Sequence, residues 1–236
     1  MKYFLILISF IVFKVSTAQE INQLDNKGER HGKWQKTFPK TNILRYQGQF
    51  NHGKPFGTFK FYEAIKNKSV LIAKRVFNSE NNLAEVTFYS SKGNVVSKGK
   101  MRNKIYVGEW LYYHKDSKQL MTQEFYNDNG SLNGTKSVYY ASGQLAETMQ
   151  YKKGFLDGES LSYSESGKLL RIENYKNDLF HGVYKTFDTK GNPVEDGQYF
   201  NDQRKGIWKF YKNGKLIEER DLTQKSNNPY KNGTKK

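Results

Sequence analysis

Apolar and polar residues alternate in short runs that recur along the chain. The clearest copy begins with Gly206-Ile207-Trp208-Lys209-Phe210-Tyr211, continues through Lys212-Asn213-Gly214 and ends with a second alternating run over residues 215–220. A period of two is typical of a β-strand, because successive side chains point to opposite faces of a sheet. An Asn-Gly pair between two such runs signals a tight turn, so the pattern predicts a β-hairpin.

The same hairpin pattern returns at a nearly constant interval. Each copy opens with a small residue, and successive openings lie 24 to 27 residues apart. The eight opening residues are Gly32, Gly57, Ala84, Gly108, Gly134, Gly158, Gly182 and Gly206. A period of this length marks an array of units that are too small to be stable alone. We therefore predict an all-β fold, an elongated array of about eight antiparallel β-hairpin repeats of 24–27 residues over residues 29–221.

The second strand of each hairpin has a regular spacing of its own. In five copies an aliphatic residue precedes an aromatic one by six positions: Leu44 to Phe50, Leu120 to Tyr126, Leu145 to Tyr151, Leu169 to Tyr175 and Val194 to Phe200. Six is a multiple of two, so both residues are expected on one face of the sheet. Glycines nine residues after the opening position, at Gly93, Gly143, Gly167 and Gly191, predict turns that need positive φ.

The pattern of Gly-x-Trp-x-x-Tyr, turn glycine, leucine, tyrosine and a polar Asn-Asp link resembles the MORN repeat family. More narrowly, it resembles the MORN-variant repeats of bacterial proteins labelled YwqK-type antitoxins. The resemblance covers residues 29–221. It implies a repeat fold that serves as a membrane-contact module, an assembly scaffold or a partner-binding surface, and some relatives neutralise a toxin.

The two ends of the chain differ from the array. Residues 1–18 predict a secretory signal peptide, with Lys2, an apolar stretch from Phe4 to Phe13 and a small-residue cleavage site before Gln19. An uncleaved N-terminal anchor is the alternative. Residues 19–28 are a lead-in, and residues 222–236 are expected to form a disordered basic tail. With no cysteine in the chain, packing alone must hold together a protein expected in the bacterial periplasm or exterior.

The charge is concentrated in the first half. Residues 19–120 contain 19 Lys and Arg against 8 Asp and Glu, whereas residues 121–221 contain 14 against 15. Within the basic half, Lys98, Lys100, Arg102 and Lys104 alternate along a predicted strand and should share one face. Such a stripe is either a solvated face that discourages edge aggregation or a site for an anionic partner.

Catalytic and metal motifs are weak in this chain. The P-loop-like stretch 48–54 is followed by Pro55 instead of Ser or Thr. The four histidines have no second histidine or carboxylate at zinc-ligand spacing. Several carboxylates are read as solvated surface, namely Glu159, Glu173, Glu195 and Glu218. We expect no enzyme activity, no cofactor, no metal and no nucleic-acid partner, with a polysaccharide-acting enzyme as a minor alternative.

Function is therefore expected to reside in a surface. We expect an exported, non-enzymatic scaffold that binds another macromolecule, most simply a protein, over an extended sheet. Trp34, Trp110 and Trp208 share one phase and are either binding anchors or core residues. The alternative function is adhesion to an anionic envelope component, a lipid headgroup or an acidic glycan, through the basic N-terminal half.

Overall fold

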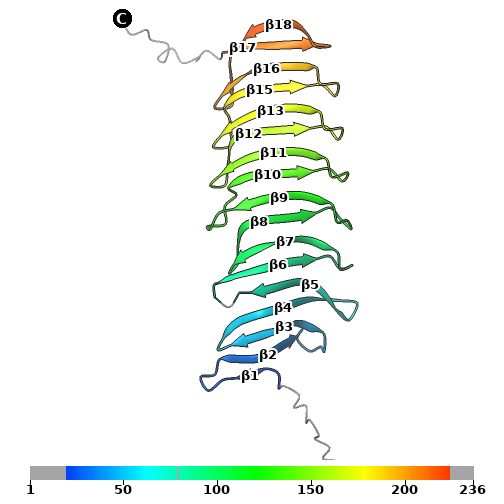
Figure 1. The fold of residues 1–236 in the computed structure, drawn as a ribbon, viewed down its shortest axis with the longest axis vertical. Coiled ribbons are helices and arrows are strands. Elements are labelled where there is room, and N and C mark those ends of the chain that lie inside the picture. The colour runs from blue at the N-terminus through cyan, green and yellow to red at the C-terminus, as the bar shows by residue number, and fades with distance from the viewer. Residues whose placement is uncertain (1–19, 79, 224–236) are drawn as a thin grey trace, which may run out of the picture.

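The computed structural model describes residues 20–78 and 80–223 as a single antiparallel sheet of eighteen strands. The strands follow one another in chain order, so the described chain begins at one end of the array and finishes at the other (Figure 1). The signal peptide expected in residues 1–18 and most of the tail expected in 222–236 lie outside the described residues. In the described part, no helix is long and apolar enough to cross a membrane.

The strands pair with their neighbours in sequence, except that the short β14 pairs only with β13 and β15 pairs with β13 instead of β14. The strands are β1 (Gln23–Leu24), β2 (Arg30–Thr37), β3 (Leu44–Asn51), β4 (Lys54–Ile65), β5 (Lys68–Phe77), β6 (Leu83–Tyr89), β7 (Val95–Arg102), β8 (Ile105–Tyr113), β9 (Leu120–Tyr126), β10 (Gly134–Tyr139), β11 (Leu145–Lys152), β12 (Phe155–Tyr163), β13 (Leu169–Lys176), β14 (Leu179–Phe180), β15 (Gly182–Phe187), β16 (Pro193–Phe200), β17 (Gln203–Lys212) and β18 (Lys215–Asp221).

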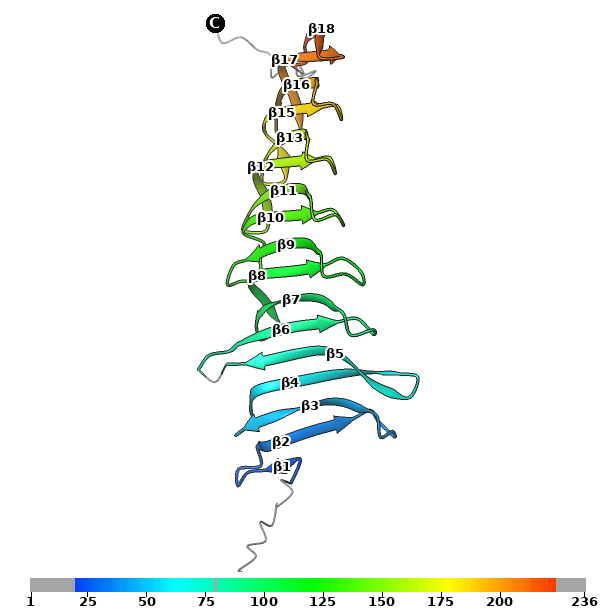
Figure 2. The same cartoon turned by 45° about the vertical axis from the view of Figure 1, so that its right-hand side comes forward.

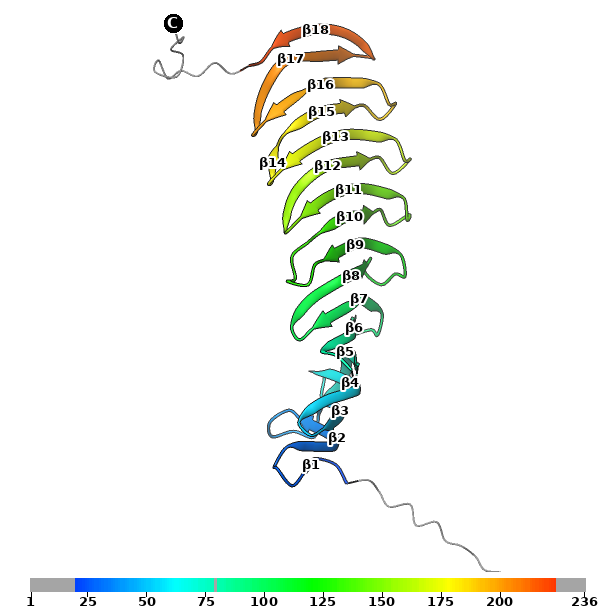
Figure 3. The ribbon, with the colours of Figure 1, turned by 60° about the vertical axis from the view of Figure 1, so that its left-hand side comes forward.

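The predicted all-β fold of hairpin repeats is confirmed. Eight hairpins, from β2–β3 to β17–β18, account for the array, and the four predicted turn glycines have φ between 80° and 93°. The β4–β5 hairpin is longer than the others and projects beyond its neighbours (Figure 2). The strands of the C-terminal half bow along their length, so the sheet is curved as well as twisted (Figure 3).

Alternation divides the sheet into two faces. We call the face that carries Phe50, Phe59, Trp110 and Trp208 the aromatic face, and the other face, which carries Lys60 and its neighbours in phase, the opposite face. Aromatic rings from successive strands contact one another on the aromatic face; for example, Phe59 lies edge-on to Phe50 with ring centroids 5.1 Å apart. These contacts across repeats bury the area that a single hairpin cannot bury by itself.

A glycine and an aromatic residue eleven positions later form a recurring unit of this core. The pairs are Gly48 with Phe59, Gly99 with Trp110, and Gly197 with Trp208. In each pair the ring lies directly on the glycine backbone, where any Cβ would overlap it. The strand pairing shifts register beside each of the three glycines, which is the signature of a β-bulge. Glycine is therefore required here for close approach.

One strand start predicted from the sequence is off by one residue, because β16 begins at Pro193 instead of Val194. Pro193 pairs with the end of the preceding strand, as Leu169 does in its own hairpin. The aromatic residue six positions on is then Tyr199, whose ring centroid lies 5.1 Å from that of Trp208. Val194 and Phe200 point to the opposite face and are about half exposed. Because apolar residues occupy both phases at 193–194 and 199–200, alternation alone did not distinguish them.

Candidate functional site

The three tryptophans lie on the aromatic face, and two of them are core residues. Trp110 and Trp208 have no exposed surface, which corrects the expectation that they anchor a partner. The ring of Tyr106 is stacked on Trp110 at 3.8 Å. The Trp110 indole N–H donates a hydrogen bond to the Lys100 carbonyl at 2.9 Å. These rings stabilise the sheet by burial and are unavailable to a partner.

Trp34 is partly buried at the N-terminal end of the array. Its indole N–H donates to the Gln23 carbonyl at 3.1 Å, so β1 covers it on one side. The Arg30 guanidinium lies 5.0 Å from its ring centroid, at cation–π distance. The contacts of Trp34 are thus internal, and a role in binding a partner stays a prediction.

The basic stripe is on the opposite face, as expected, but it is shorter than predicted. Lys98, Lys100 and Arg102 belong to β7, and both lysines are exposed. Lys104 is not part of the strand, because the chain turns at Asn103, where φ is +58°. Arg102 forms an ion pair with Asp128 at 3.1 Å. The stripe therefore retains two lysines without an ion pair among the described residues.

A second arrangement of lysines runs across the strands instead of along one strand. Lys60 on β4 and Lys74 on β5 are directly opposite each other in the strand pairing. Lys74 faces Thr87 on β6, which in turn faces Lys98 on β7. We call Lys60, Lys74 and Lys98 the lysine row. None of the three forms an ion pair with a described residue, although Lys98 lies 5.8 Å from the ring centroid of Tyr113.

The lysine row was not predicted from the sequence, because its members are 14 and 24 residues apart and meet only through the register of strands β4 to β7. Like charges directly opposite in a sheet are destabilising. The fold gains nothing from placing Lys60 against Lys74, so the pairing favours a role for the row in binding.

Three shallow hollows lie on the opposite face, one behind each glycine of the glycine–aromatic pairs. The Gly48 hollow, of about 300 Å³, is lined by Ile21, Lys33, Trp34, Gln35, Gln47, Gly48, Gln49, Thr58 and Lys60. No carboxylate lines it. By contrast, the hollow behind Gly99 includes Glu85 and Glu109, and the hollow behind Gly197 includes Asp196. Only the first of the three is purely cationic and amide-rich.

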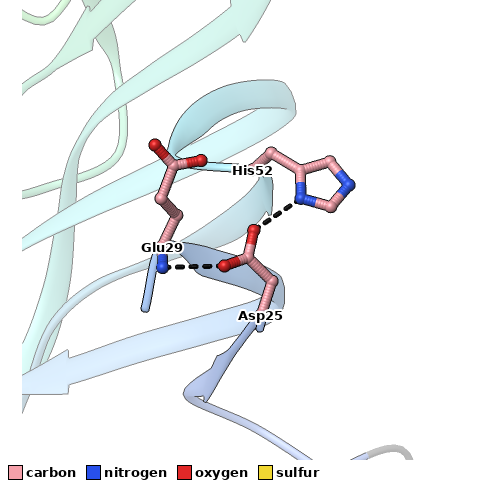
Figure 4. Close-up of side chains that lie close together, drawn as sticks. All are labelled: Asp25, Glu29 and His52. Carbon is pink, nitrogen blue, oxygen red and sulfur yellow. Dashed lines mark hydrogen bonds and ion pairs between the residues drawn. The ribbon is translucent and has the colours of Figure 1, made fainter. Parts of the chain in front are cut away.

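Among the described residues, the side chains of Asp25, Glu29 and His52 form a group that could hold a metal ion, and their ligand atoms lie within 4.8 Å of one another (Figure 4). His52 Nδ1 lies 2.5 Å from Asp25 Oδ2, and the other Asp25 oxygen accepts hydrogen bonds from the N–H groups of Lys27 and Glu29. The His31 ring centroid is 4.7 Å from that of His52. This proximity was not predicted from the sequence, because the turn that holds Asp25 and Glu29 meets His52 only in the fold.

We assign this group to structure, because both carboxylate oxygens of Asp25 already have hydrogen-bond partners and the turn motif recurs. Asn127 and Asp188 each accept the same pair of backbone N–H groups, two and four residues ahead, in turns without a histidine nearby. Such turns fix a hairpin locally. At the N-terminal end of the array, the additional hydrogen bond between His52 and Asp25 connects the turn after β1 to the first repeat.

The stabilisation that the Asp25–His52 hydrogen bond gives to β1 is expected to depend on pH. The hydrogen bond from His52, followed by that from the Glu29 N–H, holds the pKa of Asp25 below its ordinary value. A lowered carboxyl pKa contributes stability that is present above the unfolded-state value, about 3.9, and lost as the pH falls through the folded-state value. In His52→Ala the protection of the Asp25 and Gly53 amides from hydrogen exchange should fall, and the Asp25 pKa should rise.

His181→Ala is the matched control for this prediction. His181 occupies the place of His31 in a later repeat, and its ring nitrogen bonds Asn201 at 3.1 Å instead of a carboxylate. This variant should leave the Asp25 titration unchanged. The same titration midpoint in wild type and His52→Ala would contradict the assignment.

Ion pairs replace the glycine–aromatic unit in the middle of the aromatic face. Lys136 Nζ lies 2.9 Å from Glu124, and Arg171 lies 3.3 Å from Glu173. Glu124 and Glu173 are 8% and 5% exposed. The expectation that Glu173 is solvated surface is therefore wrong. Each carboxylate also accepts a tyrosine O–H, at 2.7 Å from Tyr126 and 3.3 Å from Tyr175, so both are fully engaged in internal bonds.

Comparisons with known proteins support the repeat assignment. The profile of the family described as "MORN repeat variant" matches residues 132–153 and 156–177, which contain the hairpins β10–β11 and β12–β13. No curated protein matches the chain. A solved structure named "Crystal Structure of TcdB2-TccC3-Cdc42" matches 84% of this chain and 13% of that chain, with 14% identity and a TM-score of 0.22. The chain therefore carries MORN repeats of the variant family, matched directly over residues 132–177.

Proposed function

We propose that the chain is an exported, non-enzymatic binding module that attaches to an anionic macromolecule of the cell envelope. The observation that carries this proposal is the lysine row: Lys60, Lys74 and Lys98 lie on one face and form no ion pair with a described residue. MORN repeats are often binding modules, and the sequence of residues 1–18 supports export.

The geometry suits an extended anionic partner. Adjacent strands lie about 4.8 Å apart, so the row places three ammonium groups within four neighbouring strands. A flat, open surface with concentrated positive charge attracts polyanions and raises their local concentration. In the C-terminal half, by contrast, Lys185 and Lys209 on the same face have acidic partners, Asp196 at 3.5 Å and Glu219 at 3.7 Å.

A protein partner is the second candidate, and a different surface favours it. Val183, Val194, Ile207 and Ile217 are exposed on the opposite face of the last four strands. Exposed apolar residues are common one by one, and these four on neighbouring strands offer apolar contact area to a protein partner. The buried tryptophans contribute nothing to it, so this candidate no longer rests on aromatic anchors.

The test replaces the row and measures binding to anionic probes. Lys60, Lys74 and Lys98 are changed together to glutamine, and the mature chain is tested against acidic polysaccharide, anionic vesicles and neutral equivalents of both. Each cation near an anionic surface contributes about 1 kcal/mol, so the triple variant should lose roughly 100-fold in affinity at low salt. Binding by the wild type should also weaken steeply as the salt concentration rises.

The control removes the same charge elsewhere. Lys152, Lys176 and Lys212 are exposed and form no ion pair with a described residue, so their triple change to glutamine should alter affinity by only a few fold. Equal losses in the two triple variants would show that total charge, not the row, attracts the probe. Failure of the wild type to bind any anionic probe would overturn the proposal and leave the protein partner.

A further inference from the structure

The Gly48 hollow has a chemistry that the lysine row alone does not have. It combines the ammonium groups of Lys33 and Lys60 with the amides of Gln35, Gln47 and Gln49 and the hydroxyl of Thr58. An amide presents two donors and an acceptor, whereas an ammonium group only donates. The hollow can therefore pair with groups that both donate and accept, in addition to a negative charge.

These polar groups are available to a ligand. Gln47 donates its amide N–H to the Tyr62 hydroxyl at 3.0 Å, which fixes the side chain and leaves its carbonyl oxygen free to accept. The side chains of Gln35 and Gln49 form no hydrogen bond with the described residues, and Lys33 forms no ion pair with them. Ile21, which is 45% exposed, adds an apolar edge to the hollow.

The hollow exists because of the packing beneath it. Phe59 occupies the space on the aromatic face where a side chain at position 48 would otherwise lie. The register shifts between Gln47 and Gln49, so the two amides flank a residue without a side chain. A buried ring thus maintains an open floor between two glutamines, and the site is built by the core instead of by flexible loops.

The position of the hollow relative to the row indicates the kind of ligand. Lys60 belongs to both, and the row continues from it across β5, β6 and β7. A sugar unit in a linear polysaccharide is about as long as the spacing between strands, about 4.8 Å. A polysaccharide lying across the strands would therefore place successive units along the row, with one unit in the hollow.

We propose that the Gly48 hollow is a subsite for one acidic sugar unit, a uronic acid or a sulfated sugar, of a linear polysaccharide that lies along the lysine row. The lysines bind the carboxylate or sulfate, and the glutamines and Thr58 bind the ring hydroxyls. The hollows behind Gly99 and Gly197 do not serve this role, because Glu85, Glu109 and Asp196 bring negative charge to them. This inference rests on the proposed function and names its ligand class.

The test removes the amides and keeps every charge. Gln35→Ala and Gln49→Ala are combined, and affinity is measured by calorimetry for a uronic-acid oligosaccharide and for vesicles that contain an anionic phospholipid. The double variant should bind the oligosaccharide about tenfold more weakly, since each amide contributes one or two neutral hydrogen bonds. Binding to the vesicles should be unchanged, because a headgroup phosphate is attracted by the lysines.

The matched control is Gln198→Ala with Gln203→Ala, which changes two glutamines without side-chain hydrogen bonds near the other end of the array. It should leave oligosaccharide affinity unchanged, and thermal unfolding should show that both variants are folded. Wild-type binding to vesicles but not to the uronic-acid or a sulfated oligosaccharide would overturn the subsite and leave the proposed function standing. Equal oligosaccharide affinity in wild type and Gln35→Ala/Gln49→Ala would also overturn it. Failure of the wild type to bind either the oligosaccharides or the anionic vesicles would overturn both the subsite and the proposed function.

Discussion

Replacing Gly99 by alanine is expected to destabilise the array by about 3 kcal/mol, the upper end of the cost of overpacking a core. The added methyl group would overlap the Trp110 ring, which has no exposed surface and no open space into which to move. Either the ring leaves its place or the bulge in the strand pairing opens. Urea unfolding followed by tryptophan fluorescence measures the loss.

The same substitution in a Trp110→Leu background separates this clash from other effects of alanine. Leucine is smaller than the indole, so Gly99→Ala should cost much less there, although Trp110→Leu is itself destabilising. An equal cost in the two backgrounds would show that the glycine is needed for its backbone and not for its contact with the ring.

The repeat period made the fold predictable from the sequence, and the reason is physical. Each hairpin carries its own alternation, and five of the eight also carry a turn glycine, so the local pattern and the global fold agree from repeat to repeat. The start of the second strand was found correctly where a single leucine marks it, as at Leu145, where β11 begins. The start was off by one residue at Val194, because the apolar residue before it, Pro193, begins β16 and pairs with the preceding strand.

The candidate site was less predictable, because it depends on contacts between repeats. Lys98 and Lys100 were identified along one strand, but the partner of Lys98 in the row is Lys74, reached through Thr87. The tryptophans were ambiguous because the same ring suits a core and an interface. A signal that identifies core rings was present in the sequence. A glycine lies eleven residues before each of the three buried rings, Phe59, Trp110 and Trp208.

Glycine–aromatic pairs also link stability to function. At Gly48, Gly99 and Gly197 the ring that stabilises the aromatic face leaves a hollow on the opposite face. The core therefore dictates where hollows occur, and the side chains around each hollow determine what it can bind. Between Gly99 and Gly197 the pattern is interrupted, and ion pairs occupy the equivalent space on the aromatic face.

Lys136→Leu is expected to destabilise the array by about 3 kcal/mol, the cost of leaving a buried charge without its partner. The side chains of Glu124 and Lys136 are only 11% and 25% exposed. Burial opposes ionisation of Glu124, but the hydrogen bonds from Tyr126 and Lys136 outweigh it and hold the pKa of this carboxyl below its ordinary value. Without Lys136, the Glu124 carboxylate keeps the hydrogen bond from Tyr126 and loses its ion pair.

The pH dependence of stability and a second substitution show whether loss of the ion pair causes the destabilisation of Lys136→Leu. A lowered pKa gives stability that is present above the unfolded-state value, about 4.3, and lost as the pH falls through the folded-state value. The gap between wild type and Lys136→Leu should therefore shrink on acidification, because a protonated Glu124 needs no ammonium group. Adding Glu124→Leu should recover most of the loss at neutral pH, since apolar residues replace a buried pair at little cost. A gap that is constant with pH and persists in the double variant would mean that the packing of the lysine stem, not its charge, stabilises the middle of the array.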